Sequence, residues 1–196
     1  MIDALTSVGA LEWLAVVAGL AYVLLAAREN IWCWPMAFIG TGASMIMLWN
    51  VSLVMDSALN LFYLIMALYG FWQWRFGGQN HSPRQVVEWP CTAHAIILLS
   101  VVLLTCTVGY WLDVNTQAAW PYVDTATTAG AVITTFMVTH KVLENWLYWI
   151  VIDAVSVWIY LERGLLLYAL LFALYTLIAV FGFVTWRKSM LNKASL

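Results

Sequence analysis

The sequence predicts an all-α, polytopic membrane protein with seven transmembrane helices, from its composition and from the length of its apolar stretches. Of 196 residues, 64% are hydrophobic and only 9% are charged, and the mean hydropathy is +0.87. Soluble domains carry about 25% charged residues, so this chain cannot cover a soluble surface. A helix needs about 20 apolar residues to cross the hydrocarbon core. Seven stretches approach this length, at roughly 11–27, 31–49, 53–74, 91–111, 120–139, 146–161 and 164–186.

The basic residues predict the orientation of the chain. In the seven-span arrangement, seven of the eight Lys and Arg residues fall on one side, and only Arg163 falls on the other. The seven are Arg28, Arg75, Arg84, Lys141, Arg187, Lys188 and Lys193. Basic residues concentrate in cytoplasmic loops, so the C-terminus is predicted to be cytoplasmic and the N-terminus outside. The net charge of −2 gives no electrostatic basis for binding nucleic acid.

The chain contains an internal repeat. Residues 59–74 and 171–186 are identical at six of sixteen aligned positions. The identical pairs are Leu59/Leu171, Tyr63/Tyr175, Ala67/Ala179, Gly70/Gly182, Phe71/Phe183 and Trp74/Trp186. Further upstream, a second match has an offset of 115 instead of 112, which a three-residue difference in one loop would accommodate. Its members are Glu29-Asn30 with Trp34 and Glu144-Asn145 with Trp149.

The repeat predicts a parallel 3+1+3 arrangement of spans within a single membrane domain, 1–196. Three spans are an odd number, so a direct duplication would invert the second copy, and one inserted span restores its orientation. The first repeat then covers 11–74, the linker helix 91–111 and the second repeat 120–186. Parallel repeats occur among transporters, whose substrate sites lie near the membrane midplane between the repeats. The architecture therefore favours a path for a solute.

One acidic side chain is expected inside a span. A carboxylate near the membrane centre costs about 2.5–3.5 kcal/mol on insertion scales, and such residues usually face a cavity or a partner. Trp146, Trp149 and Asp153 are spaced i, i+3, i+7 and so share one helix face, with Asn145 preceding them at the membrane edge. Two indoles beside a carboxylate would form a cage for an aromatic cation. The alternative is a protonated or threonine-bonded Asp153 that holds helices together.

Other polar residues in the spans are candidates for the same path. Asn60 and Tyr63 lie one turn apart on the third span and would supply hydrogen bonds to a solute; the alternative for Asn60 is an interhelical hydrogen bond. A ridge of small residues at steps of four runs along the fifth span and favours close packing against another helix, although its hydroxyls would also suit a path. It consists of Thr127, Ala131, Thr135 and Thr139.

Several kinds of site are not expected. The three histidines and three cysteines are scattered, so the sequence predicts no metal site, disulfide framework or cofactor. It contains no G-x-x-x-x-G-K-[ST] phosphate loop and no G-x-S-x-G elbow, and no nucleophile–base pair can be assigned, so an enzyme is not expected. The competing class is a non-transporting membrane scaffold or sensor, in which Asp153 and the tryptophan face serve packing alone.

The motifs in combination resemble those of the PnuC family of vitamin transporters. The strongest is ENWLYW at 144–149, followed by Asp153 and Tyr160. The run YGFWQW at 69–74 is similar to a Tyr-Gly-Trp-x-x-Trp element of that family. Further matches are Arg28-Glu29-Asn30 with Trp32 and Trp34, and Gly182 with Trp186. The resemblance therefore covers nearly the whole chain.

The resemblance implies a fold related to the SWEET sugar transporters, often assembled as a trimer in the bacterial inner membrane. It implies facilitated diffusion of a water-soluble vitamin, which a cytoplasmic kinase then phosphorylates and traps. The family's binding groups fall on Trp146, Trp149, Asn60 and Tyr63. Asp153 stands where members that carry nicotinamide riboside more often have Asn, and relatives specific for thiamine are short, like this chain. Both vitamins are cationic ring compounds, and thiamine is favoured by a narrow margin; the expected partners are this vitamin and membrane lipid.

Overall fold

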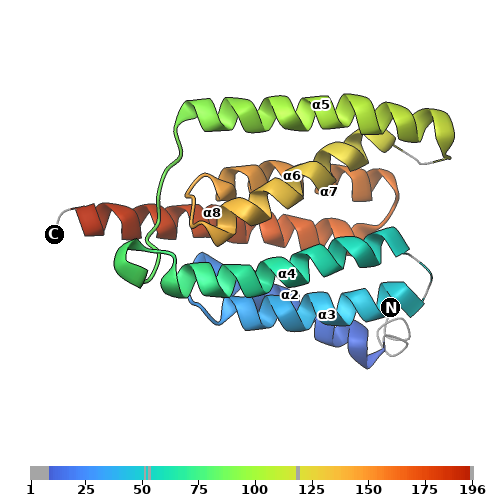
Figure 1. Cartoon of the computed structure of the whole chain (residues 1–196). Coiled ribbons are helices and arrows are strands. Elements are labelled where there is room, and N and C mark those ends of the chain that lie inside the picture. Colours follow the sequence, from blue (N-terminus) through green and yellow to red (C-terminus); the bar gives the residue numbers. More distant parts are fainter. Residues whose placement is uncertain (1–8, 51, 53, 118–119, 195–196) are drawn as a thin grey trace. The chain divides into compact units, whose positions relative to one another are not determined.

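The computed structural model describes residues 9–50, 52, 54–117 and 120–194. These residues form seven α-helices and one short 3-10 helix (Figure 1). The chain divides into two compact units, with the boundary between Gln85 and Val86. The boundary lies in the segment 77–90, which contains η1 (Gln79–His81).

The first unit consists of α2 (Ala10–Ala27), α3 (Cys33–Asn50) and α4 (Val54–Phe76). The helix α3 packs against both of the others. It comes close to α2 at Gly40, where an added Cβ would lie 3.3 Å from the Cβ of Ala18. Small residues on both helices therefore allow their backbones to come close.

The second unit consists of α5 (Cys91–Asn115), α6 (Pro121–Thr139), α7 (Asn145–Glu162) and α8 (Leu166–Ala194). Each helix packs against the next in sequence. The segment before α5 also pairs with the turn between α6 and α7, since the Val87 N–H donates to the Lys141 carbonyl at 3.0 Å and the Leu143 N–H donates to the Val87 carbonyl at 2.8 Å. This pairing fixes the end of the unit at which α7 begins.

The seven α-helices coincide with the seven stretches expected from the sequence, but two helices are longer. The helix α8 continues to Ala194, past the expected end at 186, and α5 continues to Asn115, past 111. Hydropathy marks only the apolar part of a helix, whereas the backbone hydrogen bonds of α5 and α8 continue into the polar segments that follow. Among the described residues, three helices are long and apolar enough to cross a membrane by length and composition, namely α2, α5 and α8 through Asn192. The other four contain more polar residues, as the threonines of α6 illustrate.

The two units, each taken by itself, have the same local geometry at positions related by a constant sequence offset. The residue numbers at which α3 and α7 begin differ by 112, as do those at which they end, and the starts of α4 and α8 have the same offset. The turns that precede α3 and α7 close with equivalent backbone bonds. The N–H of Asn30 donates to Leu25 at 2.9 Å, and the N–H of Val142 donates to Met137 at 3.0 Å.

The same offset relates two tryptophan pairs. In the first unit, the rings of Trp34 and Trp74 meet edge to face, with centroids 5.4 Å apart. In the second, the rings of Trp146 and Trp186 do the same at 5.4 Å. The structural counterpart of Trp34 is therefore Trp146, and the offset of 115 expected upstream, which matched Trp34 with Trp149, is wrong. The backbone hydrogen bonds of the two turns show which positions are equivalent. By these bonds, the Glu-Asn pairs at 29–30 and 144–145 do not occupy equivalent positions.

Candidate functional site

Asp153 lies near the middle of α7, on the face that packs against α8. Only 5% of the residue is exposed, and its carboxylate lies within electrostatic range of the Tyr175 hydroxyl on α8. Within the described residues no hydrogen bond to this carboxylate is found, and its oxygens are not among the fully enclosed unpaired atoms, so they keep some accessible surface. A buried carboxylate without a hydrogen-bond donor is unusual, because burying a charge is costly unless it is paired. This side chain is therefore suited to pair with a cation.

The hydroxyl groups of Ser156, close to Asp153 in the sequence, and of Thr176 on α8 do not donate hydrogen bonds to the Asp153 carboxylate. Ser156 donates to the Ile152 carbonyl at 2.9 Å, and Thr176 donates to the Phe172 carbonyl at 2.9 Å. Such bonds to the carbonyl four residues earlier are the usual way in which a helix satisfies its own Ser and Thr. Within the described part of the chain, the threonine-bonded alternative for Asp153 thus finds no donor.

The two indoles expected to form a cage have different surroundings. Trp146 is only 3% exposed, and its ring lies against Gly182 so closely that a Cβ there would come within 2.7 Å of it. With Trp186 on its other side, the ring of Trp146 packs α7 against α8. Trp149 is only partly buried. The shared helix face is thus divided into a packing residue and a ring with accessible surface.

Asn145 is fully buried at the first turn of α7. Its side-chain amide donates to the Val142 carbonyl at 2.6 Å, while its Oδ1 atom has no hydrogen-bond partner within the described residues. The preceding residue, Glu144, accepts a hydrogen bond from the backbone N–H of Trp89 at 3.3 Å. These contacts hold the start of α7 in place and leave one side-chain oxygen of Asn145 unpaired within the described residues.

Asn60 and Tyr63 belong to the first unit, on α4, whereas the other four expected site residues belong to the second. The Asn60 amide donates to the Asp56 carbonyl one turn earlier, at 2.9 Å. The ring of Tyr63 is partly buried and meets that of Phe62 edge to face, with centroids 5.5 Å apart. Both side chains are accessible in part, and the Asn60 carboxamide is already engaged with its own helix.

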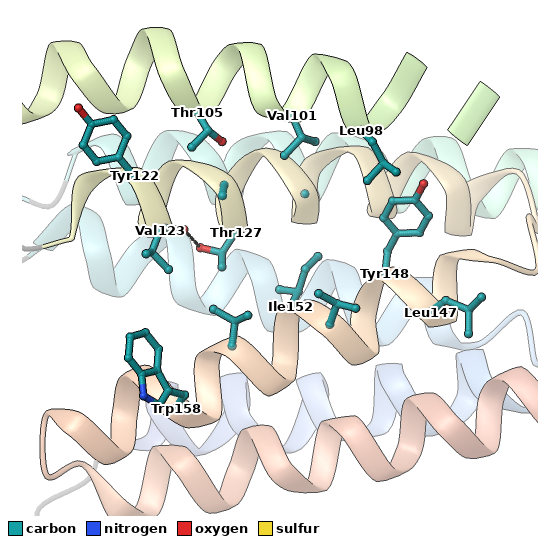
Figure 2. A pocket seen from close by; sticks show the side chains of 14 residues that line it. Leu98, Val101, Thr105, Tyr122, Val123, Thr127, Leu147, Tyr148, Ile152 and Trp158 are labelled. Atoms are coloured by element: carbon teal, nitrogen blue, oxygen red, sulfur yellow. Dashed lines mark hydrogen bonds between the residues drawn. The ribbon is translucent and has the colours of Figure 1, made fainter. Parts of the chain in front are cut away.

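A groove of about 720 Å³ lies elsewhere in the second unit, between α5, α6 and α7 (Figure 2). Its walls are almost entirely apolar and carry no charged side chain. On α7 it is lined by Tyr148, Ile152 and Trp158, which a helical period of 3.6 residues puts on the side away from Asp153. Thr127 of the small-residue ridge lines it, next to Gly130. This groove suits an apolar chain and offers a cation no charged partner.

The family of the chain follows from a comparison with known families. Residues 9–188 match the model of the family described as nicotinamide mononucleotide transporter. The chain belongs to this family. It is the PnuC family that the sequence motifs resemble.

Individual PnuC relatives are distant but similar in length. The nicotinamide riboside transporter PnuC of Escherichia coli is 23% identical over 210 residues, with 94% of this chain and 88% of that protein covered. The riboflavin/roseoflavin transporter RibM of Streptomyces davaonensis is 21% identical over 173 residues, covering 87% and 81%. The fold matches a crystal structure of the vitamin B3 transporter PnuC with a TM-score of 0.68 and 20% identity, covering 92% of this chain and 83% of that one. The protein is therefore a multi-pass membrane protein of a vitamin-transporter family.

Two features of this PnuC-family chain were missed at the level of sequence. Tyr175 was noted only as the repeat partner of Tyr63, although its spacing from Gly182 and Trp186 puts it on the α8 face that meets Asp153. Gly182 was noted only as a motif residue, although it forms the socket for Trp146. A helical-wheel projection of α8 against α7 would have found both, once the pairing of these helices was known.

Proposed function

We propose that this protein mediates the uptake of a water-soluble cationic vitamin by facilitated diffusion, with thiamine favoured by a narrow margin over nicotinamide riboside. One observation carries the proposal. The Asp153 carboxylate is buried in the middle of α7, and no hydrogen bond from the described residues reaches it. A positively charged ring would supply the partner that it lacks.

A bound cation would offset the free-energy cost of burying the Asp153 carboxylate. An isolated carboxylate in an apolar site is unfavourable, and an opposite charge within about 4–6 Å favours its ionised form. Partly buried Trp149, one turn before Asp153 on the same face, adds a ring that would contribute about 0.5–2 kcal/mol by a cation–π contact. Charge and aromatic surface together suit a flat cationic ring better than a neutral one.

The choice of vitamin rests on this charge. Thiamine and nicotinamide riboside each carry a fixed positive charge on an aromatic ring, so Asp153 suits either. Riboflavin, part of the printed name of one relative, is neutral and would leave the carboxylate unpaired. Asn60 and Tyr63 in the first unit, and Asn145, Trp146 and Trp149 in the second, remain our proposed substrate-binding residues beside Asp153.

The test is calorimetric titration of the purified full-length protein in detergent with thiamine, nicotinamide riboside and riboflavin side by side. We expect Asp153→Asn to weaken cation binding by about 10- to 100-fold, the range for losing a charged partner, and Trp149→Phe to weaken it by about two- to five-fold. Asp113→Asn, an exposed carboxylate in the last turn of α5, is the matched control. Unchanged affinity in both site variants would refute the proposal, and no binding or uptake of any vitamin would favour the scaffold class.

Facilitated diffusion makes its own prediction in reconstituted liposomes. Without a vitamin kinase, and with the membrane potential held at zero, thiamine should equilibrate across the membrane and not accumulate, whether or not a pH gradient is imposed. Enclosing a kinase and ATP should convert equilibration into accumulation of the phosphorylated vitamin. Accumulation driven by a proton gradient alone would contradict the passive mechanism. The orientation that we propose, with the C-terminus cytoplasmic, is supported by Arg187 and Lys188, both exposed near the end of α8.

We also propose that the two units are repeats in a parallel 3+1+3, SWEET-like arrangement, with α5 as the linker helix. The support is the common sequence offset of helix boundaries, turn hydrogen bonds and tryptophan pairs. The trimeric assembly implied by the family resemblance is part of the same proposal. The mass of the purified protein in detergent, measured by light scattering, would distinguish a trimer from a monomer.

A further inference from the structure

Four aromatic rings form a continuous run along the contact between α7 and α8. The ring of Tyr160 is stacked on that of Tyr168, with centroids 5.3 Å apart and planes 24° apart. It is also stacked on Phe172, with centroids 5.2 Å apart and planes 29° apart. Phe172 in turn meets Tyr175 edge to face at 5.7 Å. Each ring thus neighbours the next at a nearly constant spacing.

The run leads from the exposed end of the helix pair to the buried carboxylate. Tyr168, in the first turn of α8, is 50% exposed, and Tyr160, Phe172 and Tyr175 are partly buried. At the far end, Tyr175 lies within electrostatic range of Asp153. Tyr160 follows Asp153 by seven residues and shares its helix face. The rings therefore connect the end of the unit near Gly164 with the middle of α7.

The opposite side of Asp153 is closed within the same unit. There, Trp146 is wedged between Gly182 and Trp186, and both tryptophans are buried. Trp146 precedes Asp153 by seven residues and Tyr160 follows it by seven, so these two rings lie at equal distances from Asp153 along α7. One end is tightly packed, and the other is lined by rings with accessible surface.

Helix packing alone does not require these rings. In the first unit, the residues at the equivalent positions of the repeat are Leu48, Asp56 and Asn60, which correspond to Tyr160, Tyr168 and Phe172. The helices α3 and α4 pack against each other without an aromatic run at these positions. The rings are therefore an addition of the second unit, the one that also carries Asp153.

We propose that Tyr168, Tyr160, Phe172 and Tyr175 form a path along which a cationic aromatic solute reaches Asp153. The face of each ring carries partial negative charge and attracts a cation, and a flat ring stacks readily on another. The ring centroids lie 5–6 Å apart and all four rings keep accessible surface, so a solute in contact with the accessible part of one ring would meet the next before it leaves the first. None of the four side chains is a carboxylate, so none would hold the solute as strongly as Asp153. The inference rests on the proposed function and extends it to the route of entry.

The test compares equilibrium binding with the rate of transport. We expect Phe172→Leu to slow the initial uptake of thiamine and nicotinamide riboside into liposomes by about five-fold, the equivalent of one cation–π contact of about 1 kcal/mol. The dissociation constant of the purified full-length protein should change by less than about two-fold, because a step on the path affects entry and exit alike. Phe172→Tyr, which keeps the ring, should transport at the original rate. Phe181→Leu is the matched control, since Phe181 is a 47% exposed phenylalanine of the same helix, outside the run.

The outcomes separate the path from the function on which it rests. Wild-type rates in Phe172→Leu and in Tyr168→Leu would overturn the path and leave the proposed function intact. A loss that Phe172→Tyr does not restore, accompanied by a lower melting temperature, would also overturn it, since the ring would then serve packing. If the wild-type protein itself neither binds nor transports either cation, the proposed function fails and the path fails with it. Slower uptake at constant affinity, restored by Phe172→Tyr, supports the path.

Discussion

The socket for Trp146 allows a quantitative prediction about the stability of the second unit. Gly182 lies on α8 directly against the indole, and a Cβ added there would lie 2.7, 2.7 and 2.8 Å from Cε2, Cζ2 and Cδ2 of the ring. Ordinary van der Waals contact begins near 3.4 Å, so Gly182→Ala requires a displacement of about 0.7 Å. All three atoms belong to one rigid ring that Trp186 supports from another side, so rotation about a single side-chain bond cannot relieve the overlap.

The expected magnitude follows from two opposing effects. Overpacking of this kind costs about 1–3 kcal/mol, and a rigid ring puts Gly182→Ala near the upper end. Alanine is a better helix former than glycine by about 1 kcal/mol, which offsets part of the loss. The net destabilisation is then about 2 kcal/mol, or a melting temperature lower by roughly 4–8 °C for a chain of this size.

The measurement is thermal unfolding of the purified protein in detergent, followed by far-UV circular dichroism. Gly42→Ala is the matched control, because Gly42 lies within α3 and its added Cβ would meet only the Leu64 side chain at 3.6 Å. That variant should be as stable as the wild type or more stable, and Trp146→Phe should relieve part of the strain in Gly182→Ala. The socket would be refuted if Gly182→Ala melted at or above the temperature of Gly42→Ala.

Two further predictions concern the turns at the ends of α7. Glu144→Ala removes the acceptor of the Trp89 N–H and should lower the melting temperature by about 2–4 °C, the effect of about 1 kcal/mol, whereas the exposed Glu162→Ala at the other end of the helix should not. Gly164 has φ +69° with nothing within 4 Å of an added Cβ, so Gly164→Ala should cost about 1–2 kcal/mol through its backbone alone. Gly164→Asn, which tolerates this conformation better, should restore most of the stability, and equal melting of the Ala and Asn variants would argue against a conformational origin.

The helices were predictable because an apolar stretch of membrane-spanning length leaves the backbone few alternatives to a helix. The family was predictable because its motifs combine residue types that apolar composition does not produce by chance, such as the Glu-Asn-Trp run at 144–146. The sequence match between α4 and α8 has a counterpart in the structure, since Gly70 and Gly182 each make room for a tryptophan ring.

The surroundings of individual side chains were less accessible to sequence reasoning. Trp146 and Trp149 share a face by period, yet one is buried because Gly182 makes room for it and the other is not. That difference depends on the helix that packs against α7. The helical period of the sequence does not reveal which helix this is. The groove was missed for a related reason, since apolar residues that line a groove, such as Ile152, have the same composition as apolar residues that face lipid.

The stability of the empty protein offers a last test of Asp153, independent of any ligand. If Asp153 is held for a solute, its buried carboxylate is uncompensated when the site is empty, and Asp153→Asn should stabilise the protein. Asparagine removes the unpaired charge whose burial is costly at nearly the same volume, so the melting temperature should rise while the affinity for thiamine falls. If Asp153 instead locks the helices together, the same substitution should lower the melting temperature. Opposite signs for stability and affinity in one variant would therefore identify a binding residue, and a loss of both would identify a packing residue.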